Sequence, residues 1–137
     1  MIDRLVFDTE PLIAYLDDEA GSDTVEGWID RVAAGEIDGY ISPITKTEVL
    51  YVGTRVGFRE ADLRASLTRL EELGVAVHDP QACWDTAATL KRTGTMALGD
   101  AYALATAIDV DGTLLIGADA DLDSVDASVE RFRTEAV

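Results

Sequence analysis

Short apolar runs alternate with segments of helical periodicity along the 137 residues of the chain. Brief apolar stretches bounded by polar or turn residues predict buried strands at 5–7, 39–42, 75–77 and 113–116. Between them, apolar residues recur every three or four positions, which predicts helices at 11–16, 22–35, 44–56, 58–73, 80–92 and 98–110. Strands and helices that alternate in this way indicate an α/β domain with a short, mostly parallel central sheet.

Local signals at the helix ends sharpen this prediction. Pro11 is typical of the first position of a helix, and Ser22 with Asp23 is typical of a helix cap. The segment that starts at Asp121 shows neither periodicity clearly. No linker and no internal repeat interrupts the chain, so we expect a single domain over residues 1–137.

Composition excludes several classes of protein. No apolar run approaches the ~20 residues that cross a bilayer, and we expect no secretion signal at the N-terminus. A single cysteine, Cys83, rules out an internal disulfide and suits a reducing cytoplasm. With one cysteine and one histidine, a zinc site made of those residue types is excluded as well. Any metal must therefore be held by oxygen.

The chain is strongly acidic, with a formal charge of −16 from 27 Asp and Glu against 11 Lys and Arg. Only two residues are lysines, Lys46 and Lys91, whereas 17 are aspartates. Hydrated carboxylates at this density favour a protein from a salt-adapted organism, because at ~1 M salt a Debye length of about 3 Å screens their repulsion. The alternative is an acidic protein with a basic partner.

Two acidic residues follow predicted strands directly. Asp8 comes after the first strand and Asp119 after the last one, so both lie at the carboxyl ends of strands. Ligands of open α/β sheets bind outside those ends, which makes both residues candidates for a functional site. An acid after a strand is also a common helix N-cap, and this alternative stays open for Asp8.

Two further acids lie on predicted helices. Asp100 shares a face with Leu104 and Ala107, and an unpaired acid on such an inward face costs several kcal/mol. A structural alternative is that Asp100 lies in the first helical turn, where the helix dipole favours negative charge. Glu48 also lies on a partly apolar helical face, and its alternative is an ion pair with Arg55.

Carboxylates brought together in this way suit a divalent metal. Neighbouring carboxylates repel, and their pKa values rise unless a cation neutralises them. Mg²⁺ or Mn²⁺ is the natural occupant of an all-oxygen site. Such an ion lowers the pKa of a bound water and stabilises charge on a phosphodiester during in-line displacement. Hydrolysis of a nucleic-acid backbone is therefore the expected chemistry.

Four segments together resemble the PIN domain in their order and spacing. They are Leu5–Ala14, Thr47–Leu50, Leu98–Ala107 and Leu114–Leu122. The resemblance covers nearly the whole chain, and the length and order of elements are similar to those of the VapC-type toxins of toxin–antitoxin pairs. It implies a three-layer α/β/α domain.

The same resemblance implies a Mg²⁺- or Mn²⁺-dependent endoribonuclease. The acidic quartet of the family falls on Asp8, Glu48, Asp100 and Asp119. Asp8, Asp100 and Asp119 would bind the metal directly or through water, and Glu48 would hold it through a water. The family also implies RNA as substrate, a small antitoxin protein and a homodimer as partners, and no membrane.

Three positions depart from the family pattern. Glu10 stands where a small polar residue is common, Gly117 where Thr is usual, and Leu122 where an aromatic is usual. The missing hydroxyl at Gly117 affects how the metal or phosphate is positioned, and Thr9 or Asp121 could compensate. Because the four acids remain, we expect catalysis to be retained.

Other interpretations remain open at this point. The segment Asp119–Glu130 has acids at four positions of a calcium-binding EF-hand loop, but it has Ser124 where that loop needs Gly. A phosphoacceptor receiver domain also clusters acids at strand ends, but it needs a lysine at the end of a late strand, and Lys91 precedes a helix. A catalytically silent PIN-like module that binds RNA or protein is the third alternative.

The remaining candidates are interpreted mostly as structural. We expect His78 in a loop, Cys83 in the core, and Trp28 and Trp84 in the core or an interface. Arg92 precedes a glycine-bounded loop and could touch a phosphate.

Overall fold

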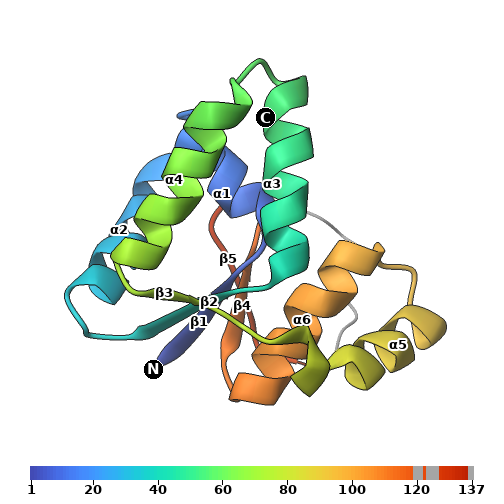
Figure 1. The fold of residues 1–137 in the computed structure, drawn as a ribbon. Coiled ribbons are helices and arrows are strands. Elements are labelled where there is room, and N and C mark those ends of the chain that lie inside the picture. The colour runs from blue at the N-terminus through green and yellow to red at the C-terminus, as the bar shows by residue number, and fades with distance from the viewer. Residues whose placement is uncertain (119–121, 123–126, 136–137) are drawn as a thin grey trace.

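A five-stranded parallel sheet forms the middle layer of the computed structural model, which describes residues 1–118, 122 and 127–135 (Figure 1). The spatial order of the strands is β3–β2–β1–β4–β5. Their bounds are β1 Arg4–Phe7, β2 Asp38–Ile41, β3 Val75–Val77, β4 Thr113–Ile116 and β5 Val129–Arg131. The first strand is central, since Val6 is level with Tyr40 of β2 on one side and with Leu114 of β4 on the other.

Helices cover both faces of this sheet (Figure 1). One face carries α1 (Thr9–Leu16), α2 (Ser22–Ala33), α3 (Pro43–Arg55) and α4 (Glu60–Glu72). The other face carries the 3-10 turn η1 (Pro80–Ala82), α5 (Trp84–Thr93) and α6 (Leu98–Val110). The predicted three-layer α/β/α architecture is confirmed. None of these described helices is long and apolar enough to cross a membrane.

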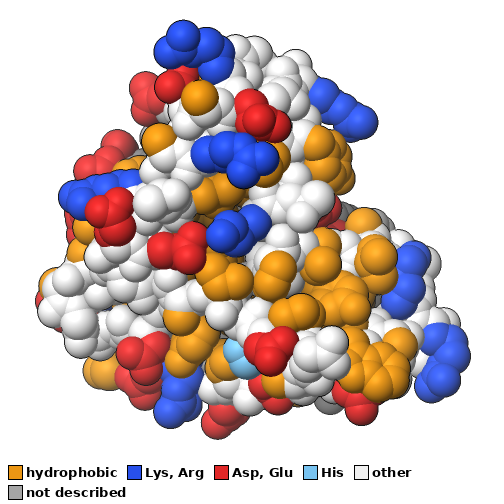
Figure 2. All heavy atoms as spheres, in the orientation of Figure 1, with side chains coloured by type: hydrophobic (Ala, Val, Ile, Leu, Met, Phe, Trp, Pro, Cys, Tyr) orange, Lys and Arg blue, Asp and Glu red, His pale blue; other side chains and the backbone are white. Residues whose placement is uncertain are grey.

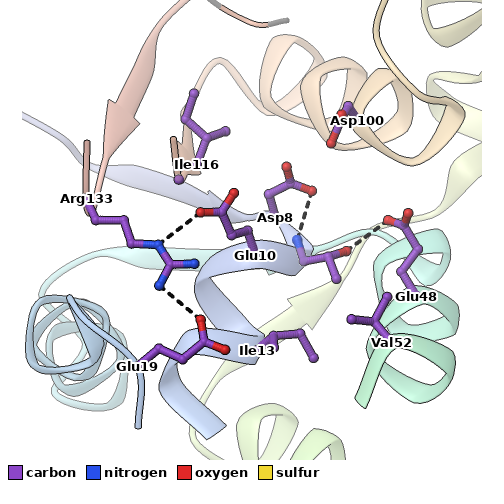
Figure 3. A pocket seen from close by; sticks show the side chains of 11 residues that line it. Asp8, Glu10, Ile13, Glu19, Glu48, Val52, Asp100, Ile116 and Arg133 are labelled. Carbon is purple, nitrogen blue, oxygen red and sulfur yellow. Dashed lines mark hydrogen bonds and ion pairs between the residues drawn. The ribbon is translucent and has the colours of Figure 1, made fainter. Parts of the chain in front are cut away.

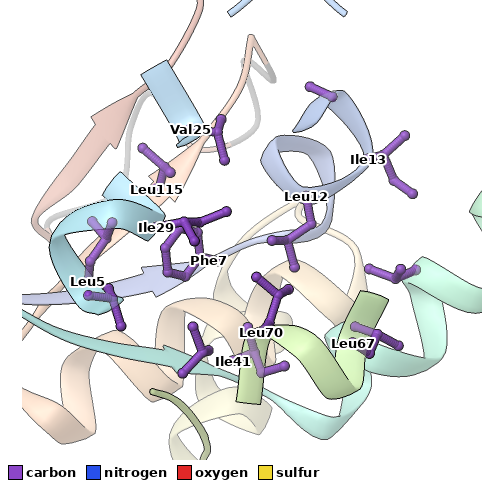
Figure 4. Packing of buried hydrophobic residues seen from close by; sticks show 14 of the residues in the cluster. Leu5, Phe7, Leu12, Ile13, Val25, Ile29, Ile41, Leu67, Leu70 and Leu115 are labelled. Atoms are coloured by element: carbon purple, nitrogen blue, oxygen red, sulfur yellow. The ribbon is translucent and has the colours of Figure 1, made fainter. Parts of the chain in front are cut away.

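Alternation along the strands divides the core into two parts. Leu5 and Phe7 of β1 pack towards α1–α4, whereas Val6 between them packs towards α6. The adjacent strand β4 repeats the pattern, with Leu115 on the first side and Leu114 on the second. Figure 4 shows Phe7 and Leu115 surrounded by the apolar faces of the helices. Each fully buried side chain of this size contributes about 1.5–3 kcal/mol by leaving water.

Two helices begin differently from the prediction. The first helix starts at Thr9, because the Asp8 side chain accepts a hydrogen bond from the Thr9 backbone N–H and so caps it; Pro11 is its third residue. The N-cap of α2 is Gly21 at φ +87°, which has no side chain to form the predicted cap. A Cβ at Gly21 would lie 2.7 Å from the Phe132 ring, so both the backbone angle and the close approach require glycine.

The structure also departs from the predicted elements in the second half of the chain. The helix predicted at 80–92 is divided into η1 and α5, because Cys83 between them has the non-helical angles φ −144° and ψ 11°. The apolar pattern predicts no strand at 129–131, where β5 is found. All three residues of β5 are only partly buried, so they carry little apolar signal.

The residues expected to have structural roles differ in how deeply they are buried. Cys83 is 1% exposed, as expected for the core. Trp28 packs against the core, and the guanidinium of Arg31 lies 4.9 Å from its ring centroid. Trp84 is 57% exposed, so a core position is wrong for this residue and only the interface alternative remains. His78 lies in a loop, with its Nε2 2.7 Å from a carboxylate oxygen of Asp109.

Candidate active site

Asp8 lies at the carboxyl end of the central strand, where the chain turns directly into α1. Its backbone N–H donates to the Leu115 carbonyl of β4 at 3.1 Å, and its Oδ1 accepts from the Thr9 N–H at 2.8 Å. The residue is 5% exposed. The helix cap predicted as the alternative for Asp8 is therefore confirmed. The same residue lies at the rim of the sheet, and its functional role stays a prediction.

Asp100 lines the same cavity as Asp8 and influences its titration. Asp100 is half-buried in the first turn of α6. Burial raises the pKa of Asp8 well above its ordinary value, and the charge of Asp100 and the hydrogen bond to it raise it further. The Thr9 N–H lowers this pKa, and the charge of Glu48 raises it slightly. The raised pKa means that Asp8 binds a proton more tightly than an isolated aspartate does when no cation is bound.

Glu48 reaches the same site from α3. Its Oε1 accepts a hydrogen bond from the Thr9 hydroxyl at 2.8 Å (Figure 3). Gly99 at the start of α6 leaves room for this carboxylate, because an added Cβ would overlap with it. The Cζ atom of Arg55 lies 5.2 Å from the centroid of the Tyr51 ring. No ion pair between Glu48 and Arg55, the alternative considered for Glu48, is found within the described residues.

These side chains line one cavity of about 270 Å³ (Figure 3). Its lining residues are Asp8, Thr9, Glu10, Ile13, Glu19, Glu48, Val52, Asp100, Ile116, Gly117 and Arg133. Three members of the predicted acidic quartet are thus brought together, along with Thr9. The cavity lies at the carboxyl ends of β1 and β4, which is where open α/β sheets bind their ligands.

Asp119, the fourth member of the quartet, and Asp121 lie outside the described residues. The strand before them, β4, ends at Ile116, and Gly117 lines the cavity, so the chain leaves the sheet at the site. The role of Asp119 stays a prediction. The EF-hand alternative loses support from Glu130, which lies in β5 and not at the start of a helix.

Arg133 lines the cavity, although no pattern in the sequence points to it. Its Nε donates to Oε2 of Glu10 at 3.1 Å, and its Nη1 donates to Oε1 of Glu19 at 3.0 Å. Its side chain is 11% exposed. Arg92, the cation that the sequence suggested, is exposed near the end of α5 and is not among the lining residues.

Two of the departures from the family pattern meet in this cavity. Oε2 of Glu10 accepts a hydrogen bond from the Ala118 N–H at 3.2 Å. A Cβ added at Gly117 would overlap with the same carboxylate. Glu10 therefore occupies the space that a side chain at position 117 would need, which links the two departures physically.

The acidic side of the cavity fits a divalent cation by the chemistry of its donors. Asp8 and Asp100 offer adjacent carboxyl oxygens with Glu48 nearby, and hard cations prefer such ligands. A cation would compete with a proton for these carboxyl groups. Across 1–118, 122 and 127–135, however, no three His, Cys, Asp or Glu residues are close enough to enclose a metal ion. Further ligands would have to come from water or from Asp119.

Solved structures share this fold. A toxin–antitoxin complex from Klebsiella pneumoniae matches with a TM-score of 0.68 and 23% identity, over 92% of this chain and 96% of that chain. VapBC2 from Rickettsia felis, bound to a promoter DNA fragment, matches with a TM-score of 0.67 and 14% identity over 93% and 98%. VapBC-1 from nontypeable Haemophilus influenzae matches with a TM-score of 0.65 and 14% identity over 94% and 98%. At these identities the likeness shows the fold.

Sequence comparison identifies the family. No curated protein matches the chain. The family model of the PIN domain matches residues 5–128, which is most of the sequence and includes all four strands that the apolar pattern predicts. The chain therefore belongs to the PIN domain family.

Proposed function

We propose that the protein is a divalent-metal-dependent endoribonuclease that hydrolyses RNA phosphodiesters. The observation that carries the proposal is that Asp8, Asp100 and Glu48 line one cavity at the carboxyl ends of a parallel sheet. Membership of the PIN family supports this chemistry, because these domains usually use divalent metal ions. We propose Mg²⁺ or Mn²⁺ as the cofactor and residues 1–137 as one nuclease domain.

Each residue of the site has a proposed task. The proposed metal ligands are Asp8, Asp100 and Asp119, with Asp121 as a further candidate. When bound, the metal supplies a nucleophile from water at neutral pH and stabilises charge on the phosphodiester. Glu48 would hold the metal through a water, and the Thr9 hydroxyl keeps the Glu48 carboxylate turned towards the site. The Thr9 N–H fixes the orientation of Asp8 in the same way.

The charge of the chain restricts how it can bind RNA. RNA is a polyanion, and the protein carries −16. Molar salt screens the repulsion, and a bound cation offsets it locally. We therefore propose a protein from a salt-adapted organism that acts in the cytoplasm and binds a folded RNA weakly and selectively.

We propose further that the protein is the toxin of a type II toxin–antitoxin system. The similar structures are described as a toxin–antitoxin complex and as VapBC assemblies. A small antitoxin protein would then be the partner that inhibits cleavage. The gene beside this one tests the assignment: a small DNA-binding protein whose coexpression relieves growth arrest supports it, and a neighbour without that effect argues against it.

An exposed apolar surface on α5 and α6 supports a homodimer. Trp84 of α5 is 57% exposed, and Leu98 and Ile108 of α6 are 55% and 47% exposed. Figure 2 shows apolar side chains gathered over these two helices, with basic side chains at the edge. Such a patch marks an interaction site, and we propose a second copy of the chain as its partner. Light scattering should then report a dimer for the wild type and a monomer for Leu98→Glu.

The test of the nuclease is cleavage of labelled RNA in molar KCl with Mn²⁺ or with a chelator. The wild type should cleave with Mn²⁺ only. Asp100→Asn should lose at least about a hundredfold in rate, since even residues that only orient metal ligands cost 10–100-fold. Asp30→Asn is the matched control, because Asp30 is exposed on α2, and it should cleave like the wild type. Equal cleavage by Asp100→Asn would point to contamination or to another site.

The second candidate is a catalytically silent PIN-like module that binds RNA or protein. The observation in its favour is that the described residues alone do not enclose a metal ion. This candidate predicts that the wild type cleaves RNA neither with nor without Mn²⁺, and that any RNA binding does not depend on Mn²⁺. Cleavage that disappears in Asp100→Asn excludes it.

A further inference from the structure

Arg133 is the one Lys or Arg among the described residues that line the cavity. The acidic side chains that line it belong to Asp8, Glu10, Glu19, Glu48 and Asp100. A phosphodiester strand is a polyanion, and its binding depends on cations that meet its phosphates. An arginine suits this task because its planar guanidinium matches the geometry of a phosphate.

The guanidinium of Arg133 is held in a fixed orientation. Its Nε donates to Glu10 at 3.1 Å, and its Nη1 donates to Glu19 at 3.0 Å and to the Ala20 carbonyl at 3.2 Å. Its Cζ also lies 4.8 Å from the centroid of the Phe132 ring. Figure 3 shows the guanidinium between the two glutamates. A side chain fixed in this way loses little conformational entropy when a ligand binds.

Glu10 is fixed in turn by the start of the segment after β4. The Ala118 N–H donates to Oε2 of Glu10, the same oxygen that accepts from Arg133. This arrangement depends on glycine at position 117, since any Cβ there would displace the carboxylate. Helix α1, the segment after β4 and the segment after β5 therefore combine to place one arginine.

We propose that Arg133 binds a phosphate of the RNA strand next to the scissile bond, and that Glu10 is the positioning residue that holds its guanidinium. The inference rests on the proposed function, since it says how the same site receives its substrate. The hydrogen bonds found within the described residues use Nε and Nη1. The N–H groups of Nη2 are thus the donors that a phosphate would accept from.

The test compares cleavage and binding of a labelled RNA hairpin by the wild type, Arg133→Gln and Arg64→Gln. Arg64→Gln is the matched control, because it removes the same charge from an exposed residue of α4. We expect Arg133→Gln to raise KM about tenfold with kcat nearly unchanged. It should also make the slope of log affinity against log salt shallower by about 0.7, the share of one phosphate contact on a single strand. Arg64→Gln should change neither quantity.

Two conservative variants separate phosphate binding from a structural role. Arg133→Lys keeps the charge, so it should keep the salt slope while KM stays raised. Glu10→Gln keeps the length and a hydrogen-bond acceptor but loses the charge that strengthens the hydrogen bond to Arg133. The guanidinium should then be held less firmly, so KM should rise while the salt slope stays the same. Melting curves check that each variant folds, and if Arg133→Gln does not fold, these two variants decide by the same criteria.

The possible results keep the inference and the proposed function apart. If the wild type cleaves, and Arg133→Gln matches Arg64→Gln in KM and in salt slope, the inference is overturned while the nuclease stands. If the wild type does not cleave, the proposed function fails, and hairpin binding alone decides the inference. Equal affinity of the wild type and Arg133→Gln, or no binding by the wild type, then overturns it.

Discussion

Asp8 at the end of β1 and Asp100 in the first turn of α6 line the same cavity, where burial and the charge of Asp100 raise the pKa of Asp8. Asp8 is 5% exposed, so water does little to screen the repulsion between them. This repulsion contributes to the raised pKa of Asp8, and a divalent cation would relieve it. This pair accounts for the proposed metal dependence, and it has consequences for stability.

The first prediction concerns pH and the free energy of unfolding. The pKa of Asp8 is raised in the folded state, so the native protein holds a proton that the unfolded chain releases at lower pH. Without divalent ion, stability should therefore fall as pH rises from the ordinary aspartate pKa through the raised one. Asp8→Asn keeps the helix cap but removes the titrating group, so this loss of stability should disappear. Its melting temperature at neutral pH should be about 4 °C above that of the wild type, which corresponds to roughly 1 kcal/mol in the free energy of unfolding.

Asp30→Asn is the control for that measurement, since Asp30 is exposed on α2. Its melting temperature in chelator should follow the wild type across the pH range. Melting of Asp8→Asn below the wild type at neutral pH would contradict the repulsion described for the pair.

The second prediction concerns Gly99, which leaves room for Glu48. Gly99→Ala should push the Glu48 carboxylate away from the Thr9 hydroxyl and lower the rate of RNA cleavage about tenfold. Gly27→Ala is the matched control, because Gly27 is also helical and has nothing within 4 Å of an added Cβ. It should leave the rate unchanged and add about 0.5–1 kcal/mol of stability. Equal rates for the two variants would show that Glu48 does not need its observed position.

The third prediction concerns the shared space of Glu10 and Gly117. Gly117→Ala should displace the Glu10 carboxylate from the Ala118 N–H and from Arg133, at a cost of about 1–3 kcal/mol in unfolding free energy. In a Glu10→Ala background, the same change at Gly117 should cost less by about 1 kcal/mol. A double-mutant cycle measured by urea unfolding gives this coupling. Additive costs would mean that the two positions do not compete for space.

The fourth prediction concerns salt. A chain with −16 charges should lose stability on dilution from molar KCl to dilute buffer, because the screening of its self-repulsion is lost. Thermal melting in a KCl series measures the effect, with sucrose of matched osmolality as the control for non-ionic effects. An unchanged melting temperature would remove the argument for salt adaptation.

Much of the site could be predicted because its signals are local. Asp8 follows a buried strand directly, and the 3.6-residue period places Asp100 and Glu48 on the inner faces of their helices. Strand ends and helical faces are properties of short stretches, so each of these acids could be placed from its local pattern. That they form one site was implied by the resemblance to the PIN domain. The order of the predicted strands and helices indicated the α/β class for the same reason, and the resemblance to the PIN domain implied the three layers.

The other side of the cavity could not be predicted, because its contacts join distant parts of the chain. Arg133 meets Glu10 across 123 positions, and it follows a strand whose three residues are all partly buried. The link between Glu10 and Gly117 is likewise a matter of shared space, which no pattern in either segment encodes. Tertiary packing alone brings these residues together.

The central claim is that the Asp8–Asp100 pair is a divalent-metal site, and a Mn²⁺ titration followed by electron paramagnetic resonance tests it most directly. The wild type and Asp30→Asn should remove free Mn²⁺ from solution with the same affinity, and this affinity should rise with pH as the pair gives up its proton. Asp8→Asn and Asp100→Asn should each bind at least about tenfold more weakly. Mn²⁺ binding that is equal in all four proteins, or absent from the wild type, would contradict the account.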